Sequence, residues 1–306
     1  MDLSWAGDIP EGLGEFPAST CSRALLLDLV ADEALPDEAI IEWKETEHLA
    51  YPTPAVDQIV VFAHYFPRGF GLPTSDFFRG LLNWYGIQLI NLTPNSILHI
   101  SIFIHFCEAF LGIPPHFGLF RDLFRVKAQS GSRVIGGLNI QLKKKESYIS
   151  VDFPSSNKNW RTNWFYCGNH EPKLPEFRPV APDPKPEWNS SPSQTDDLTT
   201  MLNAIRFLKM QGVTGAVVVS SFLYRRIQPI QKREIPAWEM DIDSIGERPE
   251  LSEVVLRGRL NAMLASLGNW SFDQRKLGFS NKEATNEVTQ THSFPSVLLM
   301  LQILDD

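Results

Sequence analysis

The run from Ile97 to Leu111 is the feature of this sequence that most constrains its fold. Thr93 can cap a helix here, Pro94 suits the first helical position, and Gly112 can end the helix. Apolar residues cover nearly every face of this helix, so it needs cover from other elements on all sides. We therefore predict that it lies at the centre of the fold.

The same run is short of a membrane span and contains three ionisable side chains, His99, His105 and Glu108. We therefore expect a buried helix and no membrane association. A buried ionisable group is costly unless it is paired, and His105 and Glu108 are spaced for a mutual contact at i, i+3. A structural pair is favoured over a catalytic acid–base pair, because no nucleophile or ligand set accompanies them in the sequence.

Further elements follow from capping residues and periodicity. Thr74 or Ser75 can cap a helix that Gly86 ends. Helical patterns also occupy residues 117–124, 198–210, 214–224 and 251–267. Residues 58–65 have the β-branched and aromatic density of a strand.

The period changes from helical to alternating after Gly131. Apolar residues alternate with polar ones over 138–142 and 149–153, and the aromatic-rich stretch 160–167 can supply a third strand. These segments predict a small antiparallel meander between residues 134 and 167. The predicted fold class is therefore α+β and mainly α-helical, with a helical core, this β-meander and a Pro-rich connecting segment.

Charge divides the chain. Residues 1–50 hold 12 acidic and 2 basic side chains, and the whole chain holds 36 and 28, so the other 256 residues carry 24 and 26. We predict an acidic, loosely ordered leader over residues 1–50 and a main domain over 51–245 with a Pro-rich connection at 171–200. A C-terminal helix and irregular tail would occupy 246–306. The near-neutral body gives no electrostatic case for strong nucleic-acid affinity.

Motifs that indicate catalysis are missing from the sequence. It contains no G-x-x-x-x-G-K-[ST] phosphate loop, no G-x-S-x-G nucleophile elbow and no H-E-x-x-H zinc helix. The glycines of residues 130–137 precede a strand pattern and indicate a turn, not a dinucleotide site. We therefore predict no catalytic, cofactor-binding or metal site, and no enzyme.

The cysteines support the same interpretation. His105 and Cys107 differ by about 200° around a helix and cannot share a metal ion without distortion. Cys167 and His170 have ligand-like spacing, but a structural zinc site needs four ligands. Three scattered cysteines indicate reduced thiols and an intracellular protein, with nucleus and cytoplasm both open.

Three basic groups provide an alternative function. They are Lys143, Lys144 and Lys145; Arg225 and Arg226; and Lys232 and Arg233. The lysines suit a solvated hairpin, and the arginines suit the C-terminal dipole of a helix. Together with Trp160, Trp164 and Tyr224 they could instead form a nucleic-acid surface. A solvated face is the default interpretation.

Several long phrases resemble a plant family of gypsy-type transposon domains. They are FPRGFGLPTSDFFRGLLNWYG (66–86), LTPNSILHISIFIHFCEAFLGIPPHFGLFRDLF (92–124), NWRTNWFYCGN (159–169) and GVTGAVVVSSFLYRRIQPIQKR (212–233). The resemblance covers roughly residues 50–240. It implies an origin in transposable elements, and it brings no established activity or catalytic residues with it.

The motifs of transposon enzymes are missing here too. Residues 243–246 (DSIG) miss the Asp-[Ser/Thr]-Gly of a retroviral-type protease by one inserted residue, and no Tyr-x-Asp-Asp is present. No strand pattern gathers the carboxylates that a two-metal integrase needs. We therefore expect a non-enzymatic structural or interaction domain, which binds an unknown protein partner or a second copy of itself.

Overall fold

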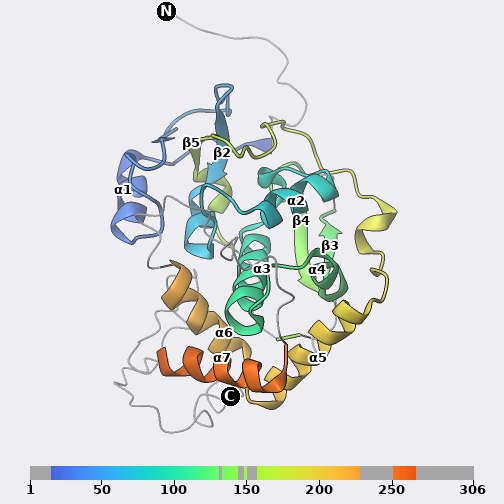
Figure 1. Ribbon diagram of the computed structural model, residues 1–306. Coiled ribbons are helices and arrows are strands. Elements are labelled where there is room, and N and C mark those ends of the chain that lie inside the picture. The colour runs from blue at the N-terminus through green and yellow to red at the C-terminus, as the bar shows by residue number, and fades with distance from the viewer. Residues whose placement is uncertain (1–14, 131–132, 144–147, 150–156, 228–250, 267–306) are drawn as a thin grey trace, which may run out of the picture.

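The computed structural model describes residues 15–130, 133–143, 148–149, 157–227 and 251–266. Its elements form an α+β fold that is mainly helical, as the sequence predicts. Figure 1 shows helix α3 (Pro94–His105) in the middle. A three-stranded sheet and α1 (Arg23–Ala31) lie toward one end of the molecule, and α5 (Asp196–Met210), α6 (Gly215–Phe222) and α7 (Glu253–Ser266) lie toward the other.

The central helix is built as its sequence predicts. Thr93 Oγ1 accepts a hydrogen bond from the backbone N–H of Ser96, and Pro94 occupies the first turn. The helix continues into the π-helical segment η4 (Phe106–Leu111), and Gly112 ends it with φ 71°. Although residues 94–111 are long and apolar enough to cross a membrane, 83% of this segment is buried inside the protein. Its apolar faces therefore serve as the core.

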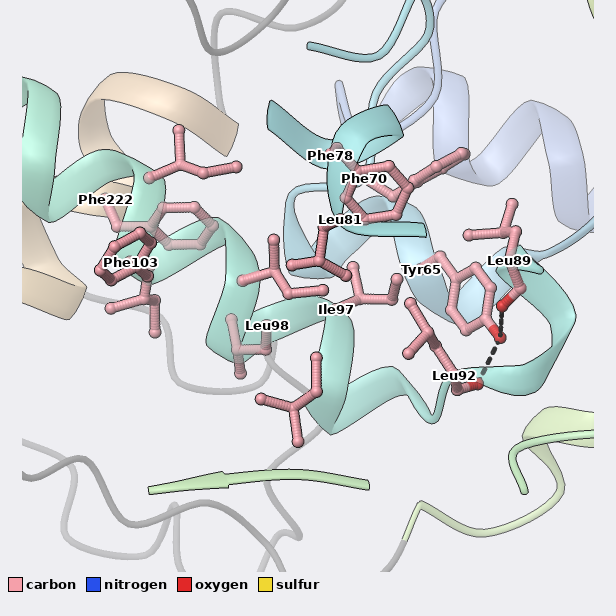
Figure 2. Packing of buried hydrophobic residues seen from close by; sticks show 14 of the residues in the cluster. Tyr65, Phe70, Phe78, Leu81, Leu89, Leu92, Ile97, Leu98, Phe103 and Phe222 are labelled. Carbon is pink, nitrogen blue, oxygen red and sulfur yellow. Dashed lines mark hydrogen bonds between the residues drawn. The ribbon is translucent and has the colours of Figure 1, made fainter. Parts of the chain in front are cut away.

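Large side chains from several elements cover α3 (Figure 2). The short helix η2 (Ala63–Arg68) places Tyr65 beside it, and the Tyr65 hydroxyl donates to the backbone carbonyl of Leu92 at 2.7 Å. At the other end of α3, Phe103 lies 5.2 Å from Phe120, centroid to centroid. The Tyr65 hydroxyl thus has a hydrogen-bond partner within the core, while the Tyr65 ring adds to the buried apolar area.

The helices that flank α3 lie where the sequence predicts them, except that α4 ends one residue earlier, at Leu123. Ser75 Oγ caps α2 (Asp76–Tyr85), and Gly86 ends it with φ 64°. Helix α4 (Phe117–Leu123) follows the turn after η4, and the His116 side chain caps it by accepting a hydrogen bond from the Leu119 N–H. Both helices present aromatic residues to α3, which confirms the predicted helical core.

The predicted meander is wrong, because the strands pair with other partners. Strand β4 (Leu138–Leu142) pairs antiparallel with β3 (Phe124–Ala128), with Val126 opposite Ile140. Strand β5 (Trp164–Gly168) lies between β1 (Trp43–Lys44) and β2 (Gln58–Phe62) in a separate antiparallel sheet. Apart from Ile149, the expected strand at 149–153 lies outside the described residues.

The prediction of a loosely ordered leader is wrong for residues 15–50. Phe16 and Cys21 are buried in the common core, and Trp43 pairs with Cys167 of β5. Ser19 Oγ also donates to the Trp164 carbonyl at 2.8 Å. The acidic side chains stay on the outside of this segment, and its apolar residues close one face of the sheet. Burial of those residues outweighs the acidic composition that suggested disorder.

The C-terminal half covers the remaining sides of α3. The Pro-rich connection is irregular except for the short helix η7 (Pro186–Asn189) and the first residues of α5. The Asn189 side chain forms hydrogen bonds with both the backbone N–H and the carbonyl of Val126 in β3. Helix α6 continues into a second π-helical segment, η8 (Leu223–Ile227). Helix α7 packs against η4 and α5. Its bounds agree with the helical pattern that the sequence shows.

Gly69→Ala should destabilise the fold by about 2–4 kcal/mol. Gly69 has φ 87°, and a Cβ atom there would lie 2.7 Å from Phe222 Cζ and 2.9 Å from Ser101 Cβ. Gly80→Ala is the matched control, because Gly80 is an exposed helical residue with nothing within 4 Å of a Cβ atom. It should stabilise the protein by about 0.5–1 kcal/mol. Urea unfolding measures both, and an equal response of the two variants would contradict the close packing of Gly69.

Candidate functional site

The polar centre of the helical core lies where α3 and η4 meet α6 and η8. His105 ends α3 and Glu108 follows in η4. Both side chains are buried and meet residues of α6 and η8. The His105 Nε2 atom lies 3.0 Å from Ser221 Oγ in α6. Arg226 of η8 joins from the same side, so these four side chains form one cluster, the His105 cluster.

An ion pair holds this cluster together. Arg226 Nη2 donates to Glu108 Oε2 at 2.5 Å, and the side chains are 22% and 4% exposed. Glu108 lies in η4 and Arg226 in η8, and both segments are π-helical. Because a π-helical turn redirects the side chains that follow it, such turns occur often at functional sites. Here the Glu108–Arg226 ion pair joins two π-helical segments, η4 and η8.

The hydrogen bonds of the cluster have a fixed direction. Arg226 Nε lies 3.4 Å from His105 Nδ1, and a guanidinium can only donate. His105 Nδ1 is therefore the acceptor, and Nε2 carries the proton that it donates to Ser221 Oγ. The Ser221 hydroxyl in turn faces the Met263 sulfur at 3.7 Å. The chain of donors runs from Arg226 outward to Met263.

Burial keeps the imidazole neutral. It lowers the pKa of His105 well below its ordinary value, and the positive charges of Arg226 and Arg225 lower it further. Burial also lowers the pKa of Arg226, while the nearby Glu108 carboxylate opposes that shift. The cluster therefore contains one charge pair and a neutral histidine.

The thiols are placed for packing, not for reaction. Cys21, Cys107 and Cys167 are all free and buried. Burial raises the pKa of Cys21 to about 12 and raises those of the other two thiols as well. Because the thiolate is the nucleophile and the metal ligand, these cysteines have the inert character of core residues.

Within the part of the chain that the structure describes, no three His, Cys, Asp or Glu side chains gather as metal ligands. The His170 imidazole lies 3.9 Å from the Glu42 carboxylate near the surface, whereas Cys167 is fully buried in β5. His105 faces Ser221, and Cys107 lies in the core. The two sequence pairs that resemble ligand sets are thus held apart from any third ligand among the described residues.

The structure separates the basic residues that the sequence groups together. Lys143 Nζ donates to the Arg121 carbonyl at 2.7 Å beside α4, whereas Arg226 pairs with Glu108 in the core. Arg225 is half-buried in η8. The remaining candidates, Lys144, Lys145, Lys232 and Arg233, lie outside the described residues.

Two aromatic candidates for a nucleic-acid surface are also in the core. Trp160 is 4% exposed and Trp164 is fully buried, so the expectation that they join such a surface is wrong. Tyr224 is exposed. The signal for Trp164 in the sequence is the continuous apolar and aromatic run 164–167, which is typical of a strand buried on both faces.

Sequence reasoning identified His105 and Glu108 but missed Ser221 and the role of Arg226. The expected direct contact at i, i+3 is replaced by a bridge, since Arg226 donates to both side chains. Arg226 lies 118 positions from Glu108, so local spacing holds no sign of the pair. A buried carboxylate without a local cation was the available signal.

The fold and this centre define a mainly helical α+β domain that closes around one apolar helix. Residues 59–128, from β2 to the end of β3, match the family described as "Putative gypsy type transposon". The chain thus contains a gypsy-type transposon-related domain, which confirms the resemblance for this segment. Comparison with curated proteins and with solved structures gave no match.

Glu108→Gln should destabilise the protein by about 3 kcal/mol, because it removes the buried carboxylate that pairs with the Arg226 guanidinium. Replacing both members, as Glu108→Leu with Arg226→Met, should destabilise the protein by less than the sum of Glu108→Leu and Arg226→Met made singly. Glu38→Gln is the control, since Glu38 pairs with Arg23 at the surface and its loss should cost below about 1 kcal/mol. Urea unfolding of the set tests this, and additive effects at Glu108 and Arg226 would contradict the pair.

Stability should fall as the pH falls from about 6.5 toward 4. Burial lowers the pKa of His64 and of His99 to about 4, so below pH 6.5 the unfolded chain takes up protons that the folded chain does not. Each such imidazole contributes up to about 1.4 kcal/mol per pH unit. His99→Phe keeps a ring against Phe124 and should reduce the slope by about one proton.

His170→Gln is the control for that slope, because the His170 side chain is 64% exposed. The test is the free energy of unfolding of the wild type, His99→Phe and His170→Gln, measured across this pH range. An unchanged slope in His99→Phe would show that His99 titrates alike in the folded and unfolded states.

Proposed function

We propose that this chain is a non-enzymatic structural or interaction domain of a transposable element, which binds a protein partner or a second copy of itself. The gypsy-type match over residues 59–128 supports the origin. One observation carries the non-enzymatic part: the direction of the hydrogen bonds in the His105 cluster.

A serine nucleophile needs a base that accepts its proton. In this cluster His105 Nε2 already carries a proton and donates it to Ser221, so the imidazole cannot act as that base. Arg226 also occupies the position where a triad places a carboxylate, and its positive charge opposes an imidazolium. The cluster is thus suited to joining helices and unsuited to acyl transfer.

Reduced, buried thiols support an intracellular location for this domain. All three cysteines of the chain are free, and each lies in the core without a disulfide. Secreted domains commonly rely on disulfides, whereas intracellular ones keep thiols reduced. We place the function inside the cell, with nucleus and cytoplasm both compatible.

Apolar side chains exposed at the seam between α5 and α7 support a protein contact. Met210 is 75% exposed and Val254 is 81% exposed. Met210 precedes Gln211 in the chain, and Val254 lies one helical turn before Arg257. Arg257 Nη1 donates to Gln211 Oε1 at 2.6 Å and so ties the two helices. We call this region the α5–α7 seam. A protein partner that covered this region would bury both apolar side chains.

Nucleic-acid binding through the segment around Arg225 to Arg233 is the alternative. Arg226 weakens it, because its guanidinium is committed to Glu108 in the core. Arg225, the other described cation of that segment, is half-buried. The protein-interaction role is therefore preferred.

Sedimentation velocity of the full chain over a range of concentrations tests self-association. We expect a dimer or larger species at high concentration, and Met210→Glu with Val254→Glu should return the chain to a monomer. Val56→Glu with Val180→Glu is the matched control, because it makes the same two changes at exposed valines that lie outside α5 and α7. A monomer at every concentration would overturn self-association and leave only a different partner.

A further inference from the structure

The solvent face of the β3–β4 hairpin is basic. In β3, Phe124 and Val126 face the core while Arg125 and Lys127 are exposed, because side chains alternate along a strand. Two residues on one face of a strand lie about 7 Å apart. Neither strand contains a carboxylate, since their sequences are FRVKA and LNIQL.

The partner strand adds polar groups in register with these cations. Arg125 lies opposite Gln141, and Lys127 lies opposite Asn139. Arg125 Nη2 donates to Gln141 Oε1 at 3.1 Å, so an uncharged amide orients the guanidinium. The positive charges on this face therefore remain uncompensated within the hairpin.

The basic region continues beyond the hairpin to the end of α4. Lys143 follows β4, and its Nζ donates to the carbonyl of Arg121 at 2.7 Å. Burial lowers the pKa of Lys143, the Asp122 carboxylate opposes that shift, and the Arg121 guanidinium adds to it. We call Arg121, Arg125, Lys127 and Lys143 the hairpin surface.

An exposed aromatic ring borders this surface. Trp84 at the end of α2 is 37% exposed, and the Arg121 guanidinium carbon lies 4.4 Å from its ring centroid. Tyr85 and Phe117 support the same ring edge-on at 4.7 and 5.2 Å. Arg121 is itself anchored, because its Nη2 donates to Ser190 Oγ at 2.7 Å. The indole is thus held in place with part of its surface open.

We propose that the hairpin surface binds single-stranded nucleic acid, with the four cations on phosphates and Trp84 stacked on an unpaired base. A cationic strip beside an aromatic ring is the combination that single-stranded nucleic acids require. An anionic membrane would instead need apolar side chains projecting between the cations, but Phe124 and Val126 face the core. The proposal goes beyond the proposed protein-interaction role, because it assigns a second class of partner to a different surface.

This surface differs from the basic groups that the sequence suggests. Lys143 is common to both, while Arg121, Arg125 and Lys127 are new. The hairpin surface also lies on other elements than the α5–α7 seam, so self-association and nucleic-acid binding can be tested separately.

Fluorescence anisotropy with a labelled single-stranded oligonucleotide, in RNA and DNA form, tests the proposal across a salt series. The wild-type chain should bind, and the affinity should weaken steeply with salt. Arg125→Gln with Lys127→Gln should lower the slope of log affinity against log salt by about 1.4, because each phosphate contact on a single strand contributes about 0.7. Both residues are exposed, so the variant should fold.

Lys44→Gln with Lys173→Gln is the matched control. It removes the same charge from two exposed positions near the other sheet and should leave the slope unchanged. Trp84→Leu keeps an apolar side chain against Phe117 but removes the stacking ring. It should weaken binding by about 10-fold and leave the salt slope as it is. Thermal unfolding confirms that each variant is folded.

Three outcomes would overturn the proposal. They are no binding at low salt, an equal loss in both double variants, and tighter binding to phosphatidylserine vesicles than to the oligonucleotide. If nucleic-acid binding fails while sedimentation shows self-association, the interaction role stands without this partner. If both fail, the nucleic-acid proposal and self-association are both overturned, and the proposed function keeps only a different protein partner.

Discussion

The need to bury one apolar helix on all sides determines the arrangement of the molecule. α3 is apolar around nearly its whole circumference, and burying that surface is worth about 25 cal/mol per Å². η2, β4 and α6 all pack against it, although they come from distant parts of the chain. The sheet that contains β5 then closes over η2 through aromatic contacts such as Phe66 with Phe165, 5.7 Å apart. Each layer thus derives its position from the helix beneath it.

Such a core tolerates polar side chains only where they can pair with one another, and in this protein they pair at the C-terminal end of α3. His105 and Glu108 leave the apolar stretch just as the helix becomes π-helical, and Arg226 reaches them from the second π-helical segment. Both π-helical segments therefore have a physical role, because they bring opposite charges together in a region of low dielectric. A pair of this kind favours one register of α6 against α3 over the alternatives.

Local signals predicted the helices, because caps, prolines and glycines act within a few residues. Thr93, Ser75, Gly86 and Gly112 all occupy the predicted positions. The sheets could not be predicted in the same way, since pairing is decided between segments distant in sequence. Ile59 lies opposite Cys167, and β3 begins at Phe124, where helical spacing suggested the end of a helix. The same limit applies to the site: His105 and Glu108 are local, whereas Arg226 is not.

Charge runs are a weaker guide to surfaces than periodicity combined with fold. Arg225 and Arg226 are adjacent in sequence, but neighbouring residues of a helix differ by about 100°, and Arg226 turns to a buried carboxylate. Arg125 and Lys127 form no run, yet the two-residue period of a strand places them on one open face. A strand with apolar residues at alternate positions and cations between them can serve the core and a polyanion at once. The hairpin surface follows from that geometry, which becomes visible only when β3 is known to be a strand.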